Sequence, residues 1–397
     1  MTYMYGLLHR GWQLLPHSLR RKAFNEISLR LAPRLDPAAN CRNAPWIIVG
    51  ALSASTGLGE AARLAVDALL AAGERVSSID LTSALQHELS VPVRELARPQ
   101  EGSGTILVFL NPPVSAMALR LIPERLLAGK HRIGCWVWEF EEAPSNWRAH
   151  AELFHKIVAP SRFAAAGIAK SIGQSVGLLP HPVAVSPIEI AQPGDRPFTV
   201  GIVGDVVAAA DRKNALAAVQ AFIHSGLKAG DARLVIHLHG QSPNAQPVQT
   251  LVDHARQSGF DIVISTGVRA RSDTRLFYAG LDLYLSLHRA EGFGLTVAEA
   301  MLAGVPVVST NWSATAEFVD HLVGYPVPYE LVPSSGTVDD RRPHRWADPD
   351  IHAAAECIRA AFHDKAARQQ RGRVARDRAE KLFSASEFMN WLQPNHD

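Results

Sequence analysis

The sequence predicts an α/β protein with two doubly wound parallel sheets, one in each of two consecutive domains. Two observations lead to this prediction. Short apolar runs of the kind that form buried strands alternate with helical segments, and the alternation passes through two separate series. The chain of 397 residues, at ~150 residues per domain, is also long enough to give each series a hydrophobic core of its own.

The first series begins after Pro45. The run from Trp46 to Leu52 is continuously apolar, which is typical of a buried strand. A segment rich in Ala and Leu, from Glu60 to Ala72, ends at Gly73, where a helix can stop. Further strands are predicted at Val76–Leu81, Gly104–Leu110, Arg132–Val137 and Lys156–Pro160, with a helix from about Ser161.

The second series begins near His181 and repeats the alternation. Strands are predicted at Thr199–Gly204, Arg233–His239, Asp261–Thr266, Leu281–Leu287 and Val305–Ser309. Helices are predicted at 213–225, 247–258, 272–279 and 296–303, and the chain from Asp350 onward is helical in pattern. Pro187–Pro197 is typical of a loop or linker. Ligands of such sheets bind at the carboxyl ends of the strands.

Composition excludes several protein classes. Forty Lys and Arg against 38 Asp and Glu leave a net charge of +2, without the strongly basic domain that a nucleic-acid partner requires. Cys41, Cys135 and Cys357 are dispersed and have no metal-binding spacing, which favours a reducing cytoplasm. The start of the chain has no convincing signal peptide, and Asn111-Pro112-Pro113 would break the longest uncharged run, so no membrane span is predicted.

Residues 1–40 are more basic than the rest of the chain. Arginines and Lys22 are interleaved with Leu, Trp12, Phe24 and Ile27 at roughly helical spacing. A basic amphipathic segment of this kind can lie on an anionic membrane surface, which would make the protein peripheral on the inner face of the plasma membrane. The alternative is a helical arm that packs on the domain and exposes its arginines to water.

The most informative stretch runs from His288 to Val308 and contains Glu291 and Glu299. It lies where an apolar strand gives way to a helix. Gly292 and Gly294 allow close backbone approach, and the amino terminus of the helix attracts anions. Two carboxylates beside an anion-binding backbone suit a ligand with both phosphates and hydroxyls, such as a sugar nucleotide. For Glu299 an alternative exists, because Thr296-x-x-Glu299 also has the pattern of a capping box.

These residues resemble the E-x7-E signature of the retaining GT-B glycosyltransferases of family four. Glu291 and Glu299 enclose Gly-Phe-Gly-Leu, and Glu-Ala-Met-x-x-Gly-x-Pro-Val-Val follows from Glu299. Ser265–Val268, Phe277–Ala279 and Glu317-Phe-Val are also similar to that family. The resemblance covers about residues 45–390, most specifically 260–320. It implies a GT-B architecture, in which two Rossmann-like domains face each other across a cleft.

The resemblance also implies roles for individual residues. Glu291 would contact hydroxyls of the donor sugar, and Glu299 would contact the ribose hydroxyls. Backbone groups along the intervening turn would hold the diphosphate. The donor-binding residues implied or predicted in this part of the chain are Val268, Glu291, Gly292, Phe293, Gly294, Leu295, Thr296 and Glu299.

Arg212 and Lys213 follow the first strand of the second series and open a helix. Two cations at the carboxyl end of a strand can neutralise a leaving diphosphate, so we predict a catalytic and donor-binding role for both. The resembling family more often separates its Arg and Lys by several residues. The alternative is an ordinary solvated helix start.

Gly57 and Gly59 lie between a strand and a helix, and Asp80 ends the next strand. This pattern matches the G-x-G-x-x-A fingerprint of dinucleotide sites and would suit an NAD-dependent oxidoreductase. However, Ser53–Thr56 separate the glycines from the strand, whereas a dinucleotide loop starts almost at the strand end. In the resembling family the same loop closes over the donor phosphates or the acceptor. We therefore assign Gly57 and Gly59 to the donor.

Trp136, Trp138 and Glu139 belong to a stretch rich in aromatic and acidic residues. Alternation places both tryptophans on one face of a strand. Trp138 could stack on an acceptor sugar and Glu139 could contact an acceptor hydroxyl, the alternative being a Trp-rich edge of the core. The first-domain histidine common in the family has no counterpart that we can place, although His181 lies at the expected hinge.

Asp348-Pro349-Asp350 spells the D-x-D motif of metal-dependent glycosyltransferases. Its position before a helix from Ile351 predicts instead that Asp348 is an N-cap. No metal and no cofactor are predicted.

The predicted organisation has four parts: a basic arm (1–40), an acceptor-side domain (41–180), a nucleotide-sugar domain (181–375) and a C-terminal helix that crosses back to the first domain (376–397). The predicted activity is retaining transfer of a sugar from GDP-mannose or a UDP-sugar to a hydroxyl of a glycan or lipid-linked acceptor, as in bacterial surface polysaccharide biosynthesis. The alternatives are a nucleotide-sugar epimerase, an NAD-dependent oxidoreductase and a non-catalytic scaffold.

Overall fold

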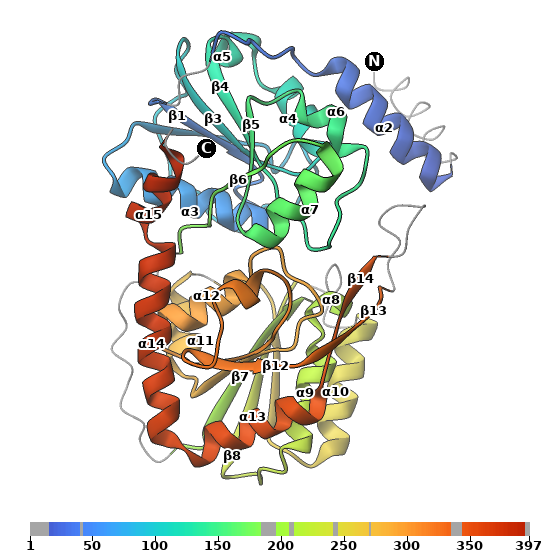
Figure 1. Ribbon diagram of the computed structural model, residues 1–397, viewed down its shortest axis with the longest axis vertical. Helices are drawn as coiled ribbons and strands as arrows, with labels where there is room; N and C mark the ends of the chain where they lie inside the picture. The colour runs from blue at the N-terminus through green and yellow to red at the C-terminus, as the bar shows by residue number, and fades with distance from the viewer. Residues whose placement is uncertain are drawn as a thin grey trace.

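The protein has two lobes, each built on a six-stranded parallel sheet with helices on both faces (Figure 1). The computed structural model describes residues 16–39, 43–183, 196–205, 210–240, 245–269, 271–334 and 344–393. This arrangement confirms the predicted fold class. Cys41 and most of the predicted linker fall outside the described residues.

The first lobe has the strand order β2-β1-β3-β4-β5-β6, so the order reverses between β1 and β3. Its strands are β1 (Trp46–Gly50), β2 (Val76–Asp80), β3 (Gly104–Phe109), β4 (Lys130–Cys135), β5 (Lys156–Ala159) and β6 (Gly177–Leu178). Its helices are α3 (Gly57–Ala71), α4 (Val114–Leu121), α5 (Glu124–Leu127), α6 (Trp147–Ala151) and α7 (Arg162–Ile172).

The second lobe has the order β12-β11-β10-β7-β8-β9, and here the reversal lies between β7 and β10. Its strands are β7 (Phe198–Asp205), β8 (Ala232–His239), β9 (Ile262–Thr266), β10 (Leu283–Ser286), β11 (Val307–Thr310) and β12 (Gly324–Val327). Its helices are α8 (Ala210–Lys213), α9 (Ala215–His224), α10 (Gln246–Ser258), α11 (Arg271–Ala279), α12 (Leu295–Leu302), the short 3₁₀ helix η1 (Ser313–Glu317) and α13 (Ile351–His363).

The predicted strands are all present, with ends shifted by a few residues, but four strands were not predicted. β6 has only two residues, and β12 contains a glycine and a proline, which are unfavourable in strands. β13 (Tyr329–Pro333) and β14 (Arg345–Pro349) pair as an antiparallel hairpin separate from both sheets. Trp346 of this hairpin joins the core of the first lobe, as does Ala290 from the loop after β10, so second-lobe residues help to close that core.

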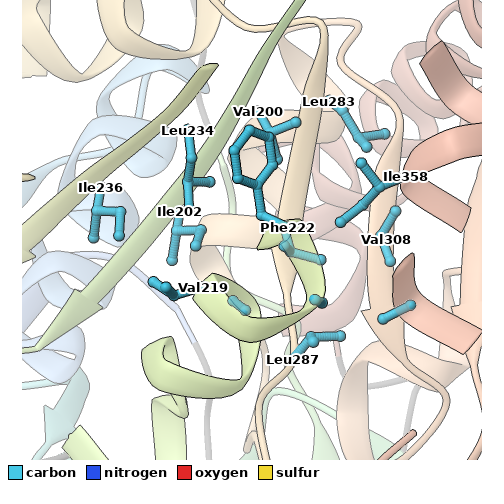
Figure 2. Packing of buried hydrophobic residues seen from close by; sticks show 14 of the residues in the cluster. Val200, Ile202, Val219, Phe222, Leu234, Ile236, Leu283, Leu287, Val308 and Ile358 are labelled. Carbon is cyan, nitrogen blue, oxygen red and sulfur yellow. The ribbon is translucent and has the colours of Figure 1, made fainter. Parts of the chain in front are cut away.

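The core of the second lobe forms where apolar side chains of the sheet meet α9 and α13. Figure 2 shows Phe222 of α9 and Ile358 of α13 among residues from β7, β8, β10 and β11. Phe222 and Ile358 are both fully buried. This packing fixes the carboxyl ends of β7 and β10 relative to each other.

The chain returns to the first lobe through α14 (Lys365–Phe383) and α15 (Ala385–Leu392). In Figure 1, α14 runs along the second lobe and α15 lies beside α3. Phe388 and Leu392 of α15 are buried in the same cluster as Trp46 and Ile48 of β1. The end of the chain is therefore part of the first-lobe core.

Residues 16–39 pack against the first lobe through α2 (His17–Leu31) and the segment after it. Asn25 Oδ1 accepts a hydrogen bond from Asn146 Nδ2 (2.9 Å), and the Arg132 guanidinium donates to the backbone oxygens of Pro33 and Arg34 (3.0 and 2.9 Å). Within the described residues, no helix has both the length and the apolar character needed to cross a membrane.

Replacing Phe388 with alanine tests how much α15 stabilises the first lobe. Phe388 is 2% exposed, so Phe388→Ala should lower the free energy of unfolding by ~3–5 kcal/mol through lost burial and a residual cavity. Leu382→Ala, at a residue of α14 that is 39% exposed, is the matched control and should cost far less. Urea denaturation followed by circular dichroism measures both, and equal effects would contradict the packing of α15.

Candidate active site

The candidate site lies at the carboxyl ends of β7 and β10, where the strand order of the second lobe reverses. Arg212 and Lys213 belong to α8, which follows β7, and Glu291 follows β10. Loops that leave a sheet in opposite directions at such a point open a crevice between them. Residues that are 78 positions apart in the sequence therefore meet.

Glu291 is held by two cations. Its Oε1 lies 2.6 Å from Lys213 Nζ, and its Oε2 lies 3.2 Å from Arg212 Nη1. Arg212 Nη1 also donates to the Ala290 oxygen at 2.7 Å. Asn214 makes this possible, because its left-handed conformation (φ 53°) separates α8 from α9 and its Nδ2 donates to the Leu287 oxygen at 3.0 Å.

Glu291 is ionised at neutral pH. Burial by itself would raise the pKa of this carboxyl, but Lys213, Arg212 and His288 outweigh burial and lower the pKa to about 2. The side chain is only 8% exposed. The site thus offers a fixed acceptor for hydroxyl groups beside two fixed cations.

His288 lies behind Glu291 and is fully buried. Its Nδ1 is 3.0 Å from Ser286 Oγ and its Nε2 is 3.0 Å from Thr315 Oγ1. Burial is the main cause that lowers the pKa of His288 to about 4, and Lys213 and Arg212 lower it further. The ring is therefore neutral at pH 7 and links β10 to η1.

The turn after Glu291 leads into α12. Gly294 adopts φ 93°, and the first intrahelical bonds run from Val297 and Ala298 to its carbonyl oxygen at 3.0 Å. The N–H groups of Leu295 and Thr296 precede those bonds, as in the first turn of any helix, and such groups can bind an anion. Phe293, between the two glycines, is 5% exposed and packs into the second-lobe core instead of facing the crevice.

Glu299 lies on α12 and accepts a hydrogen bond from the buried Tyr278 hydroxyl at 3.0 Å. The capping box considered for Thr296 and Glu299 is wrong, because α12 begins at Leu295 and its N-cap is Gly294, without a side-chain cap. Glu299 is only partly buried, so it is held in place by Tyr278 without being enclosed. Val268 is half-buried just after β9, at the same edge of the sheet.

The Gly57 loop of the first lobe is organised by its own residues. Thr56 caps α3 by accepting from the Gly59 N–H at 3.1 Å, and a Cβ on Gly59 would lie 2.6 Å from the Ala51 oxygen. Gly57 has open space around it. Asp80 Oδ1 accepts hydrogen bonds from Ser53 and Thr82 and its Oδ2 accepts one from the Ser53 hydroxyl, so Asp80 holds the loop.

Trp138 and Glu139 are neighbours in the sequence, but one is buried in the first-lobe core and the other contacts the second lobe. β4 ends at Cys135, so Trp136 and Trp138 follow the strand; both are buried in the first core, and Trp138 donates its indole N–H to the Glu142 oxygen at 2.8 Å. The Trp-rich core edge is therefore what the structure shows. Glu139 instead reaches across to the second lobe, where Oε1 lies 3.5 Å from Arg212 Nη2.

The prediction that Asp348 is an N-cap is wrong. Asp350 caps α13 by accepting from the N–H groups of His352 and Ala353, both at 2.9 Å. Asp348 lies on β14 and pairs with Arg289 at 2.6 Å. No group of three His, Cys, Asp or Glu side chains suited to a metal occurs among the described residues.

Three contacts of the site were missed by sequence reasoning. Ser313 Oγ accepts from the Glu291 N–H at 2.9 Å, Ser161 Oγ donates to the Gly292 oxygen at 2.7 Å, and Tyr278 fixes Glu299. Only Ser161 carried a local signal, since its place before a helix predicts an N-cap; a partner 131 positions away leaves no trace in the sequence.

The candidate site lies within a stretch of the chain that is similar to known proteins. Residues 197–335 match the sequence model of the family "Glycosyl transferases group 1". The lipopolysaccharide core biosynthesis mannosyltransferase LpsB of Rhizobium meliloti (strain 1021) is 54% identical over 43 residues, which are 11% of this chain and 12% of that protein. The chain thus spans about an eighth of the length of this curated relative.

Solved structures show the same architecture over most of the chain. A glycosyltransferase from Rickettsia africae superposes with a TM-score of 0.62 at 14% identity, covering 88% of this chain and 96% of that one. Anabaena HepE in complex with UDP-glucose gives a TM-score of 0.61 at 14% identity, covering 87% and 97%. The fold is therefore that of the GT-B glycosyltransferases.

His288 should make stability depend on pH. Its pKa is about 4 in the folded protein and ordinarily 6.5, so the unfolded chain binds more protons between these values. The free energy of unfolding should therefore be undiminished by His288 above pH 6.5 and should decrease as the pH drops toward 4. Protonation of His288 should account for ~3 kcal/mol of this decrease.

The pH series of unfolding free energy for His288→Gln should be flatter than that of the wild type over this window. His363→Gln, at an exposed histidine, is the control and should keep the wild-type slope. A His288→Gln slope equal to that of the control would show that the ring is not held neutral.

Proposed function

We propose that the protein is a glycosyltransferase of the group 1 type, which transfers a sugar from a nucleotide diphosphate sugar to an acceptor hydroxyl. One observation carries the proposal. Ionised Glu291, flanked by Arg212 and Lys213, lies at the switch point of the sheet beside the amino terminus of α12. This arrangement falls within the stretch that matches the family.

The geometry suits a donor that carries both phosphates and hydroxyls. The diphosphate would lie against the first N–H groups of α12, with Arg212 and Lys213 neutralising the charge that develops as it leaves. Glu291 would accept hydrogen bonds from the sugar hydroxyls and Glu299 from the ribose. Binding of the anion would draw the two cations partly away from Glu291 and from Glu139.

We further propose that the protein belongs to the retaining glycosyltransferases of family four, which carry the E-x7-E signature. In the same-face scheme that this resemblance implies, the bond from the anomeric carbon to the phosphate oxygen breaks and the bond to the acceptor oxygen forms on the same side. The acceptor proton passes to the departing phosphate. No metal is required by this scheme, because Arg212 and Lys213 supply the positive charge.

Both donor classes have support. HepE was crystallised with UDP-glucose, and LpsB is named a mannosyltransferase of lipopolysaccharide core biosynthesis. A glycan or lipid-linked acceptor, as in bacterial surface polysaccharide biosynthesis, fits the name of LpsB. The alternative of an NAD-dependent oxidoreductase is disfavoured, because Asp80, which would bind the ribose, already accepts hydrogen bonds from Ser53 and Thr82. An epimerase of the same fold would use the donor without an acceptor.

The donor assignment is tested by isothermal calorimetry with UDP, GDP, their sugar conjugates and NADH. One nucleoside diphosphate should bind the wild type selectively, and Glu299→Ala should weaken its affinity about tenfold through loss of the ribose contact. Glu356→Ala, at an exposed carboxylate of α13, is the control and should bind like the wild type.

The stereochemistry of the transfer is then determined from the product. With the selected donor and an acceptor, proton NMR should show an unchanged anomeric configuration, and inversion would exclude the family four mechanism. Conversion of the donor to a different sugar nucleotide without acceptor would indicate the epimerase. Binding of NADH alone would move the active site to the Gly57 loop and contradict the proposal.

A peripheral membrane location belongs to the same proposal. Leu19, Ile27 and Leu31 of α2 follow one side of the helix at spacings of eight and four residues and are 51%, 44% and 51% exposed. Exposed Lys22 lies beside them, and exposed Arg30, whose Nη2 is 3.8 Å from Glu26 Oε2, lies between Leu19 and Ile27 around the helix. An apolar stripe with cations beside it suits an anionic bilayer surface, which would place the enzyme next to a lipid-linked acceptor.

Vesicle flotation tests this surface. The protein should float with vesicles that contain phosphatidylglycerol, and less at high salt, but not with phosphatidylcholine alone. Ile27→Glu combined with Leu31→Glu should reduce flotation several-fold, because two charges would enter the apolar layer. Leu322→Glu, at a residue of the second lobe that is 65% exposed, is the control, and equal flotation of both variants would contradict the role of α2.

A further inference from the structure

We propose that Ser161 and Glu317 form a latch between the lobes that sets the geometry of the donor-binding turn, with Ser161 as a positioning residue. The inference rests on the proposed function of that turn. Ser161 contacts the backbone of Gly292, and Glu317 belongs to η1, whose Ser313 contacts the backbone of Glu291, so both act through the backbone around Glu291.

Ser161 connects the lobes with a single hydroxyl. As N-cap of α7 in the first lobe, its Oγ accepts from the Ala164 N–H at 3.0 Å. The Ala164 N–H can only donate, so the hydroxyl proton is left for the Gly292 oxygen, 2.7 Å away in the second lobe. Ser161 is 5% exposed, so water does not replace either partner easily.

Glu317, in the second lobe, binds the amino-terminal end of the same helix, α7. Its Oε1 accepts from the Phe163 N–H at 2.7 Å and its Oε2 from the Arg162 N–H at 3.0 Å. A carboxylate across the first N–H groups of an eleven-residue helix also interacts favourably with the helix dipole. The ring of Phe163 packs edge-on against Trp312, just before η1.

The latch lies directly against the backbone of the site. Gly292 has no room for a side chain, because a Cβ would lie 2.4 Å from Val137 Cγ1 and 3.0 Å from the Trp138 oxygen of the first lobe. On its other side, Glu291 donates its N–H to Ser313 Oγ, and the Ala314 N–H donates to the Glu291 oxygen at 3.2 Å. The backbone on both sides of the Glu291 side chain is therefore held.

Closure of the lobes and formation of the donor turn are therefore linked. Glu317 and Ser313 belong to the same short helix η1, so one rigid element touches both α7 and Glu291. Separation of the lobes would break the Ser161 and Glu317 bonds together and release the Gly292 carbonyl. Only the closed arrangement therefore supplies the contacts that hold the Gly292 backbone, next to Glu291, in this position.

Small-angle scattering of the ligand-free protein tests the latch itself. Ser161→Ala and Glu317→Gln should each give a larger radius of gyration than the wild type. Ser161→Thr, which keeps the hydroxyl, should restore the wild-type value. Asp350→Ala removes a comparable N-cap from α13 in the second lobe and should leave the radius unchanged although it also lowers stability.

Calorimetry with UDP and GDP and steady-state kinetics measure the consequence. Ser161→Ala should weaken nucleotide affinity about tenfold and raise the KM for the donor more than it lowers kcat, and Ser161→Thr should stay within about twofold of the wild type. If Ser161→Ala has the same radius of gyration and the same nucleotide affinity as Asp350→Ala, the proposed latch is wrong. If the radius changes as expected but the wild type binds neither nucleotide, the latch stands and the proposed function fails.

Discussion

The buried charge of Glu291 is the constraint on which the arrangement of the site depends. A carboxylate placed in a protein interior is stable only when opposite charges compensate for the lost hydration. Lys213 and Arg212 supply that compensation, and the left-handed residue Asn214 ends α8 where both can reach it. The same two cations are what the diphosphate of the proposed donor would need, so under the proposed function the ion cluster would also serve as the anion site.

The two lobes contribute residues to each other's packing. Trp346 of the β13–β14 hairpin and Ala290 from the loop after β10 enter the core of the first lobe. Phe388 of α15 belongs to the separate cluster on the other face of the first-lobe sheet. In return, the first lobe supplies Ser161 and Glu139 to the second-lobe site. Because residues cross in both directions, the turn after Glu291 packs directly against the interface between the lobes.

Several side chains with the right chemistry for a ligand are used internally. Asp80 follows a glycine loop at the spacing expected of a ribose ligand but holds Ser53 and Thr82. Trp138 has the ring that stacks on sugars but is packed in the core. Asp348 has the motif of a metal ligand but pairs with Arg289. Residue type and spacing are equally compatible with a ligand or an internal partner, and only the fold decides between them.

The sequence by itself determined the α/β class, the two series of strands and helices, and the region of the site. Each of these depends on local information: apolar runs for buried strands, glycines at turns, and acidic and basic residues at strand ends. The ends of β1, β7 and β8 lie close to their predicted positions for this reason.

The tertiary structure alone decided which of these groups meet. Glu139 pairs with Arg212, Ser161 with Gly292, and Glu317 with the start of α7. The hairpin β13–β14 likewise depends on a core in the other lobe, and its short strands carry no periodicity strong enough to predict. These contacts join residues that are far apart in sequence, and their free energy comes from burial and charge pairing that exist only once both lobes have formed.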